Sequence, residues 1–375
     1  MRKIHHQECP VIPPHIWRQL AEHGDDDARE RVASTLYHSQ RLTAGREATL
    51  IGERAVAAPM STRKTRRVYD ARHQQKLPGK LVMGDGKAIS TDVEAMEAFD
   101  GCGATHDFLA KAFGRNSIDD KGLPLVATIH YGINFDNAMW NGTQIVFGDG
   151  DGKYFNRFTI ALDVIAHELT HGVTQLEAAL EYRGQSGALN VHLSDAMGIM
   201  VKQWVLGQIA SQSDWLIGAG LFGPNVRGKA VRSMKAPGTA YDDPIIGRDP
   251  QPAHMRNYVQ TAEDNGGVHI NSGILNHAFY LFANAVGGPV WPVAGRLWYE
   301  VQTEQLYPQA GFQDFATATV KTAGVRYGIG GPVQRALAGA WSQVGLPVPP
   351  SLMRKAPQPW NRLKWRNRPL KRRAA

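Results

Sequence analysis

The sequence is poor in cysteine and has no long apolar segment. Its 375 residues include only two cysteines, Cys9 and Cys102, which excludes the disulfide framework typical of small secreted domains. No stretch reaches the roughly 18 consecutive apolar residues of a transmembrane helix. The basic residues after Met1 are not followed by the roughly 7–15 apolar residues of a classical signal peptide. We therefore expect a globular protein with no membrane span.

Acidic residues are absent from the end of the chain. A formal net charge of +8 would suggest nucleic-acid binding by the whole protein. The positive charge is concentrated in residues 350–375, however, which contain no Asp or Glu, so that the rest of the chain is nearly neutral. With Trp360 and Trp365 among its charges, this tail favours contact with an anionic surface such as nucleic acid or lipid. The alternative is a solvated tail. Its nine basic residues are Arg354, Lys355, Arg362, Lys364, Arg366, Arg368, Lys371, Arg372 and Arg373.

Hydrophobic patterning divides the chain into regions of different secondary structure. Apolar residues make up 43% of the sequence, enough for a sizeable core. Residues 1 to about 50 show helical spacing. Strand-like runs at 125–131 and 144–147, broken by Gly and Asn, predict a β-rich region up to about Gly152. Helical spacing then dominates to about Gly345.

One segment has the residue spacing of a metal site: Asp163-Val-Ile-Ala-His-Glu-Leu-Thr-His. On a helix, His167 and His171 lie one turn apart on the same face, so that two imidazole nitrogens can meet one metal ion. Zinc suits imidazole ligands, and Glu168 can accept a proton from a water that zinc has activated. The pattern alone fits two surface histidines on an amphipathic helix equally well, so the surrounding sequence has to decide.

Several further blocks occur along the chain in a fixed order. They are Phe113-Gly-Arg-Asn-Ser-Ile-Asp-Asp, Asn137-Ala-Met-Trp-Asn-Gly, Phe147-Gly-Asp-Gly-Asp-Gly, Ser186-Gly-Ala-Leu-Asn, Arg232-Ser-Met and Asp264-Asn-Gly-Gly-Val-His-Ile-Asn-Ser-Gly. Over about residues 66–346 the chain resembles the thermolysin family of zinc metallopeptidases. The segment Cys9-Pro-Val-Ile-Pro-Pro-His resembles the short propeptide of its protealysin branch.

The resemblance implies a fold and an organisation. We expect an α+β, two-lobe metallopeptidase with a β-rich N-terminal lobe, a mainly α-helical C-terminal lobe and the active-site helix between them. The expected segments are a propeptide-like segment at 1–50, the N-terminal catalytic lobe with the metal-site helix at 51–175, the C-terminal catalytic lobe at 176–348 and a basic, proline-containing tail at 349–375.

It also implies an activity. The expected protein is a secreted, monomeric zinc endopeptidase, made as a zymogen with its own propeptide, which hydrolyses polypeptides on the N-terminal side of apolar residues. By position, His167 and His171 would bind zinc, Glu168 would be the general base and Asp195 would orient the first histidine. Three further residues would act on the oxyanion of the tetrahedral intermediate: Tyr182, His269 and its partner Asp264.

Substrate-binding residues follow in the same way. Asn137 and the Ala138 backbone would pair with the peptide as an added strand, and Arg232 would hold a substrate carbonyl. Four apolar residues would line the pocket for the side chain after the scissile bond: Phe155, Phe158, Val164 and Val231. Surface ion pairs, turns and core packing remain the plain structural interpretations of these positions.

The third zinc ligand is missing from the expected place. The family has a Glu in the block that reads Gly187-Ala-Leu-Asn-Val-His-Leu-Ser-Asp here, so that Val191 replaces it, and valine has no lone pair for a metal. His192 is a candidate replacement but points about 100° away on a helix. Asp195 shares the face of Val191, and Cys9 could bind zinc before the propeptide is removed. A weakly held zinc is therefore expected.

Two further expectations follow. If the metal site is degenerate, the protein instead acts as a peptide- or partner-binding module. Calcium binding is doubtful, because Lys202 stands where the family has a calcium-binding carboxylate, although Asp163 and Asp214 remain. The run Gly148-Asp-Gly-Asp-Gly lacks the spacing of a calcium or phosphate loop, and we expect a tight turn there.

Overall fold

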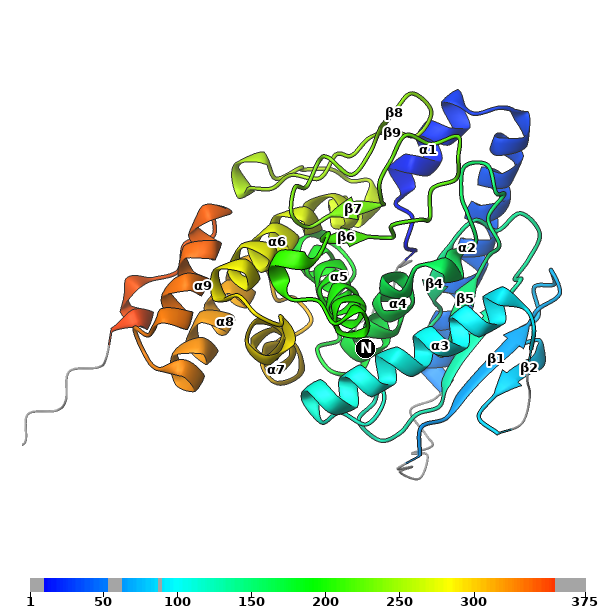
Figure 1. Cartoon of the computed structure of the whole chain (residues 1–375). Helices are drawn as coiled ribbons and strands as arrows, with labels where there is room; N and C mark the ends of the chain where they lie inside the picture. Colours follow the sequence, from blue (N-terminus) through cyan, green and yellow to red (C-terminus); the bar gives the residue numbers. More distant parts are fainter. Residues whose placement is uncertain (1–9, 53–62, 87–89, 355–375) are drawn as a thin grey trace, which may run out of the picture.

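The computed structural model describes residues 10–52, 63–86 and 90–354. Figure 1 shows a sheet-containing region and a helical region on either side of helix α4 (Leu162–Leu176). The basic tail from residue 355 onward and Cys9 lie outside the described residues. In the part of the chain that is described, no helix is both long and apolar enough to span a membrane.

The N-terminal lobe contains one five-stranded sheet. Its strands are β1 (Arg66–Asp70), β2 (Lys80–Gly84), β3 (Leu125–Ile129), β4 (Ala138–Trp140) and β5 (Ile145–Phe147). The spatial order is β2-β1-β3-β5-β4, with β1, β3 and β5 parallel and the outer strands antiparallel to their neighbours. The three parallel strands therefore end at the same edge of the sheet, and β4 is left as an edge strand beside α4.

Helix α3 (Val93–Phe108) packs between the sheet and α4. The hydrophobic periodicity did not indicate this helix, because it contains two glycines and lacks a clear apolar stripe. The glycines serve close packing, since a Cβ at Gly101 would lie 2.4 Å from Ile165 of α4, and one at Gly103 would lie 2.3 Å from Arg66 of β1. Contacts outside the helix therefore require residues that helix propensity disfavours.

The C-terminal lobe is built from helices. They are α5 (Gly184–Leu206), α6 (Asp264–Val286), α7 (Arg296–Glu304), α8 (Phe312–Tyr327) and α9 (Pro332–Gln343). Two short hairpins, β6–β7 (Leu216–Ile217 with Arg232–Ser233) and β8–β9 (Asp242–Asp243 with Gly247–Arg248), lie between α5 and α6 in the sequence. Helix α5 packs against both α4 and α6, and most of its residues from Ser186 to Val201 are buried.

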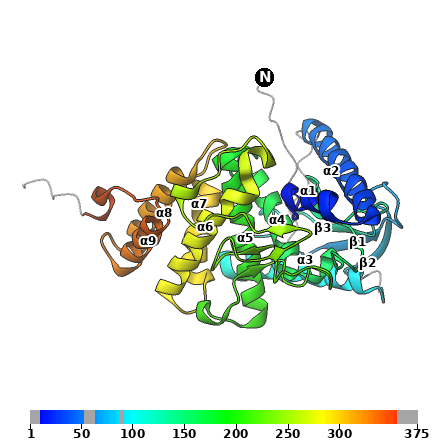
Figure 2. The ribbon, with the colours of Figure 1, turned by 90° about the horizontal axis from the view of Figure 1, so that it is seen from above.

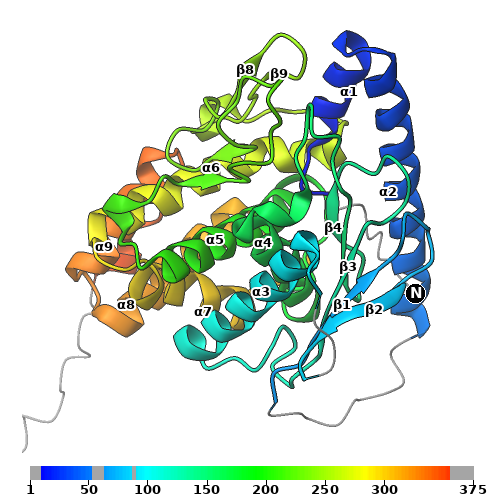
Figure 3. The same cartoon turned by 45° about the vertical axis from the view of Figure 1, so that its right-hand side comes forward.

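The N-terminal segment forms two helices, α1 (Pro14–His23) and α2 (Asp26–Gly52). Figures 2 and 3 show them beside the sheet, on the opposite side of the molecule from α8 and α9. Ile16, Trp17 and Leu20 of α1 are buried against the core, and Arg31 of α2 makes a bidentate ion pair with Asp136. The segment is thus an integral part of the packed structure.

Candidate active site

Two buried histidines of α4 form the centre of the site. His167 and His171 are at most 1% exposed, and their Nε2 atoms lie 3.0 Å apart. His167 Nδ1 lies 2.8 Å from Asp195 of α5, and His171 Nδ1 lies 2.9 Å from the side-chain oxygen of Asn190. With the proton of each ring on Nδ1, beside its oxygen neighbour, both Nε2 atoms would present a lone pair to the space between them. One metal ion could then be bound by both rings.

Asp195 is the most strongly held carboxylate of the site. It is fully buried and receives two hydrogen bonds from Arg232, at 2.9 and 2.8 Å, and one from Asn276 at 2.8 Å. Burial raises the pKa of this carboxyl, but Arg232 and His167 together outweigh it and hold the pKa well below its usual range. Burial also lowers the pKa of His167. Asp195 is therefore ionised and His167 neutral, the state in which a histidine can bind a metal.

Glu168 and a second group of side chains complete the centre. The backbone N–H of Trp140, in β4, donates to the Glu168 carboxylate at 2.7 Å. Tyr182 Oη lies 3.1 Å from His269 Nε2, and His269 Nδ1 lies 2.6 Å from Asp264. The edge strand, α4, the chain before α5 and the start of α6 thus each contribute to one site.

The start of α6 has an unusual backbone that places His269. Asp264, Asn265, Gly266 and Gly267 all have positive φ, from 49° to 87°. Asp264 can therefore accept from the backbone N–H of His269 as well as lie against its ring. Glycines occupy two of these positions, where a Cβ would lie 3.1 Å from the backbone of Gly184 (Gly266) and 2.8 Å from the Asn271 side chain (Gly267).

A segment of the same chain lies on the edge strand beside these residues. Val11 N–H donates to the carbonyl of Ala138 at 3.0 Å, and Ile12 N–H donates to the side-chain oxygen of Asn137 at 3.2 Å. Arg232 donates to the carbonyl of Val11 at 3.1 Å. These contacts extend the sheet by an antiparallel β-bridge between Pro10 and Met139.

The apolar residues expected to line a pocket are all buried. Phe155, Phe158, Val164 and Val231 are at most 1% exposed. The ring of Trp17, in α1, lies 5.0 Å from the ring of Phe155. The N-terminal segment therefore contacts both the edge strand β4 and part of this apolar surface.

Comparisons with known proteins identify the family. Residues 52–175 match the thermolysin metallopeptidase catalytic domain, residues 178–346 match its alpha-helical domain, and residues 9–48 match the protealysin propeptide. The chain is 50% identical to an extracellular metalloprotease of Pectobacterium carotovorum, over 91% of this chain and 97% of that protein. It is 41% identical to the protease PrtS of Photorhabdus, over 90% and 92% of the two chains.

A solved structure gives the same result. The precursor of protealysin, a metalloproteinase from Serratia proteamaculans, matches with a TM-score of 0.82 and 48% identity, over 90% of this chain and 99% of that one. The chain belongs to the thermolysin family of metallopeptidases. The predicted thermolysin-like, two-lobe α+β fold is confirmed, and so is the presence of a protealysin-type propeptide.

Thermolysin-family enzymes use zinc, and this chain fits the metal in part. The two Nε2 atoms of His167 and His171 are close enough to share one cation. Val191, where the resemblance implies a third ligand, is fully buried in an apolar cluster with Tyr182 and Val268. Two imidazoles are therefore suitably placed for zinc, and Val191 offers no donor atom.

Both ring nitrogens of His192, the candidate replacement ligand, have hydrogen-bond partners in this structure. Its Nδ1 lies 2.7 Å from the side-chain oxygen of Asn276, and its Nε2 accepts a 2.7 Å hydrogen bond from the indole of Trp298. Burial lowers the pKa of His192 to about 4. Both ring nitrogens are thus used in the helical core, in agreement with the direction expected from helix geometry.

The position of the expected thermolysin-family calcium ligand contains a cation of its own. Lys202 Nζ lies 3.2 Å from Asp163, 3.0 Å from both carboxylate oxygens of Asp214 and 3.1 Å from the carbonyl of Leu216. An ammonium group therefore binds the oxygen atoms that a calcium ion would need.

Sequence reasoning missed three residues that support this site. Asn190 and Ser194 contact His171 Nδ1, at 2.9 and 3.2 Å, and Asn276 donates to Asp195. Asn190 lies in one of the sequence blocks that resemble the family, so the sequence could have indicated that it belongs to the site. Asn276 lies two turns after His269 on α6, and only the packing of α6 on α5 reveals its role.

Proposed function

We propose that this chain is the zymogen of a zinc-dependent endopeptidase that cleaves before apolar residues and that holds zinc weakly because Val191 supplies no ligand. The 3.0 Å separation of His167 Nε2 and His171 Nε2 supports this most directly, since one metal ion can be bound by both atoms. His167 and His171 would hold the metal, which when bound supplies Lewis-acid chemistry at the scissile carbonyl.

The chain's own residues would carry the remaining steps. Glu168, oriented by the Trp140 N–H, would accept the proton of the attacking water at its carboxylate. Tyr182 and His269 would stabilise the developing oxyanion, with Asp264 fixing the imidazole. Each donor would then act where charge develops in the transition state.

The propeptide supports the proposed substrate geometry. Asn137, Ala138 and Arg232 already bind an extended peptide through backbone atoms of Val11 and Ile12. A substrate would use the same contacts after the propeptide leaves, with an apolar side chain on the Phe155 surface. The propeptide therefore would inhibit by occupying the peptide-binding edge.

Zinc content and proteolysis test this proposal together. Mature protein would be dialysed against a series of zinc concentrations, followed by elemental analysis and casein cleavage. We expect cleavage that appears only at high free zinc and disappears in the variant His167→Ala. Zinc-independent cleavage, or one tightly bound zinc per chain at trace concentrations, would contradict it.

A binding module is the second candidate function. It is favoured by the same observation that the peptide-holding residues are complete while the metal ligands are not. The discriminating measurement is fluorescence anisotropy of a labelled peptide containing the sequence 10–16, with the mature protein. Binding without cleavage at saturating zinc supports this second function and rejects the first.

Maturation and export are further parts of the proposal. Relatives carry the name extracellular metalloprotease, which supports secretion of this chain as well. The basic residues at 63–67 would suit proteolytic removal of the propeptide. Arg66 and Arg67 pair with β3, however, and Arg66 also binds Asp85. We therefore expect processing before residue 66. N-terminal sequencing of active, secreted protein checks this, and an intact Met1 would contradict it.

A further inference from the structure

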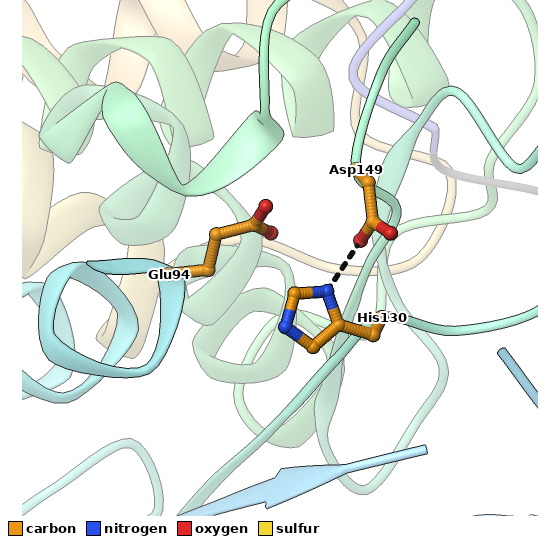
Figure 4. Close-up of side chains that lie close together, drawn as sticks. All are labelled: Glu94, His130 and Asp149. Atoms are coloured by element: carbon orange, nitrogen blue, oxygen red, sulfur yellow. Dashed lines mark hydrogen bonds and ion pairs between the residues drawn. The ribbon is translucent and has the colours of Figure 1, made fainter. Parts of the chain in front are cut away.

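Three side chains that the proposed function does not use meet at one edge of the sheet. Figure 4 shows Glu94, His130 and Asp149 pointing toward a common space. His130 directly follows β3, Asp149 follows β5, and Glu94 lies in the first turn of α3. One potential ligand atom from each lies within 4.8 Å of the others. Parallel pairing of β3 with β5 explains why these two positions are neighbours.

His130 is held in a fixed orientation. Its Nδ1 lies 2.9 Å from Asp149, and its Nε2 lies 2.9 Å from Asp92 on the other side of the ring. The backbone of His130 is left-handed, with φ of 50°. A carboxylate on the far nitrogen is the arrangement that orients metal-binding histidines in proteins.

Glu94 is aimed at this space with an unused oxygen. Its Oε2 atom is buried and has no hydrogen-bond partner within the described residues. Burial, followed by the charge of Asp149, raises the pKa of Glu94 to about 7. Arg157, whose charge also acts on Glu94, makes its two hydrogen bonds to Glu97 instead. The orphaned oxygen therefore is an independent sign of a missing partner.

The cluster as a whole is short of positive charge. Three carboxylates, those of Asp92, Glu94 and Asp149, surround one imidazole. Hydrogen bonding to Asp149 is the main cause that raises the pKa of His130 to about 10. A divalent ion in this space would neutralise two of these carboxylates at once.

We propose that Glu94, His130 and Asp149 form a second metal site, which binds a divalent transition metal ion such as Zn²⁺. One nitrogen and two carboxylate ligands suit zinc, whereas calcium selects oxygen ligands alone. The ion replaces the proton on His130 Nδ1, and Asp92 keeps its contact with Nε2. Bound metal would tie α3 to the ends of β3 and β5, and so has a structural role in the N-terminal lobe.

The test separates this site from the catalytic histidines. In the full chain carrying His167→Ala and His171→Ala, equilibrium dialysis with Zn²⁺ alone should still show one bound ion. Adding Glu94→Gln should weaken this binding by more than about 100-fold, since loss of a ligand exceeds the 10–100-fold effect of an outer partner. Asp92→Asn should give that smaller effect. The matched control is Asp100→Asn, an exposed position on the same helix, which should change nothing.

Two results would overturn the proposal. Either the background chain binds no zinc, or Glu94→Gln binds it as tightly as the background does. Circular dichroism of each variant shows that it is folded, and Glu94→Gln keeps the shape of the side chain. Competition by excess Ca²⁺ should fail, and displacement of zinc by calcium would assign the site to a different ion class and reject a transition-metal site.

Discussion

Two positions on helix α5 at which a metal-binding carboxylate is expected carry side chains with opposite consequences for charge. By its resemblance to the family, the chain should have a metal-binding carboxylate at both Val191 and Lys202. Val191 has no donor and packs with Tyr182 and Val268. Lys202 places an ammonium group within 3.2 Å of Asp163 and Asp214.

The difference shows what each metal would contribute. Asp163 is 2% exposed, and a buried carboxylate requires a cation nearby. Lysine supplies that cation, so the fold keeps its charge balance. Val191 packs with Tyr182 and Val268 and brings no charge of its own into the core, so that this side chain needs no ion for charge balance. We infer that Lys202 preserves stability without calcium, whereas Val191 preserves stability but impairs zinc binding.

Restoring the ligand at Val191 should give the largest effect. Val191→Glu puts a carboxylate where the resemblance implies the third zinc ligand, so zinc affinity should rise by more than about 100-fold, beyond the effect of an outer partner. Casein cleavage should rise with it. Elemental analysis and proteolysis of the native chain and the variant measure both.

Val191→Gln is the matched control, because it has nearly the same shape and no charge. It should recover much less zinc than Val191→Glu. If Val191→Glu binds zinc tightly and remains inactive, the binding-module function gains support.

Removing the internal cation should give the next largest effect. Lys202→Met keeps the side-chain length but leaves Asp163 without its ammonium partner, which should cost about 3–5 kcal/mol of unfolding free energy. Urea unfolding measures it. The native protein should show the same stability with EDTA and with added calcium.

The variant Lys202→Glu sharpens this comparison. It should be strongly destabilised in EDTA and recover in part with calcium, because three carboxylates then need an ion. Equal stability of Lys202→Met and the native chain would show that Asp163 is satisfied in another way.

Replacing His192 should affect stability alone. His192→Phe fits the aromatic surroundings of Phe279, Trp298 and Phe315. It leaves the Trp298 N–H and the Asn276 oxygen without a partner, which should cost about 1–3 kcal/mol. Thermal unfolding and zinc content are measured together. A loss of zinc would mean that His192 is a ligand after all.

Acid should loosen the propeptide through His15. Burial lowers the pKa of docked His15 to about 4, below its usual value near 6.5, and its ring lies 2.6 Å from the hydroxyl of Tyr241. Docking therefore favours the neutral ring. The contribution of His15 to the stability of the docked propeptide is complete above about pH 6.5 and declines as pH falls toward 4. The population of docked propeptide relative to released propeptide should fall by roughly 20-fold from pH 7 to pH 5.

Protease sensitivity of the propeptide in the Glu168→Gln variant measures this release. Asp136 opposes the effect, since burial raises its pKa to about 6 and it pairs with Arg31 of α2. His15→Gln isolates the histidine contribution and should remove the acid response. An unchanged response would assign it to other groups.

Local sequence could predict the site only in part. The spacing of His167 and His171 determined that both rings share a helix face, because the helical repeat is a local property. The same repeat correctly directed His192 away from them. Helix α3 escaped prediction because its glycines serve contacts with Ile165 and Arg66, which lie far away in the sequence.

The sequence by itself thus indicated the family, and it is the basis for proposing the metal-binding pair and the lost ligand at Val191, since each is a matter of residue identity at a known spacing. Only the tertiary structure decided the role of charges that meet from distant segments. It placed Lys202 between Asp163 and Asp214, and the Val11 carbonyl against Arg232. It also brought Glu94, His130 and Asp149 together. Electrostatic energy depends on distance in space and on burial, and neither is encoded in local sequence pattern.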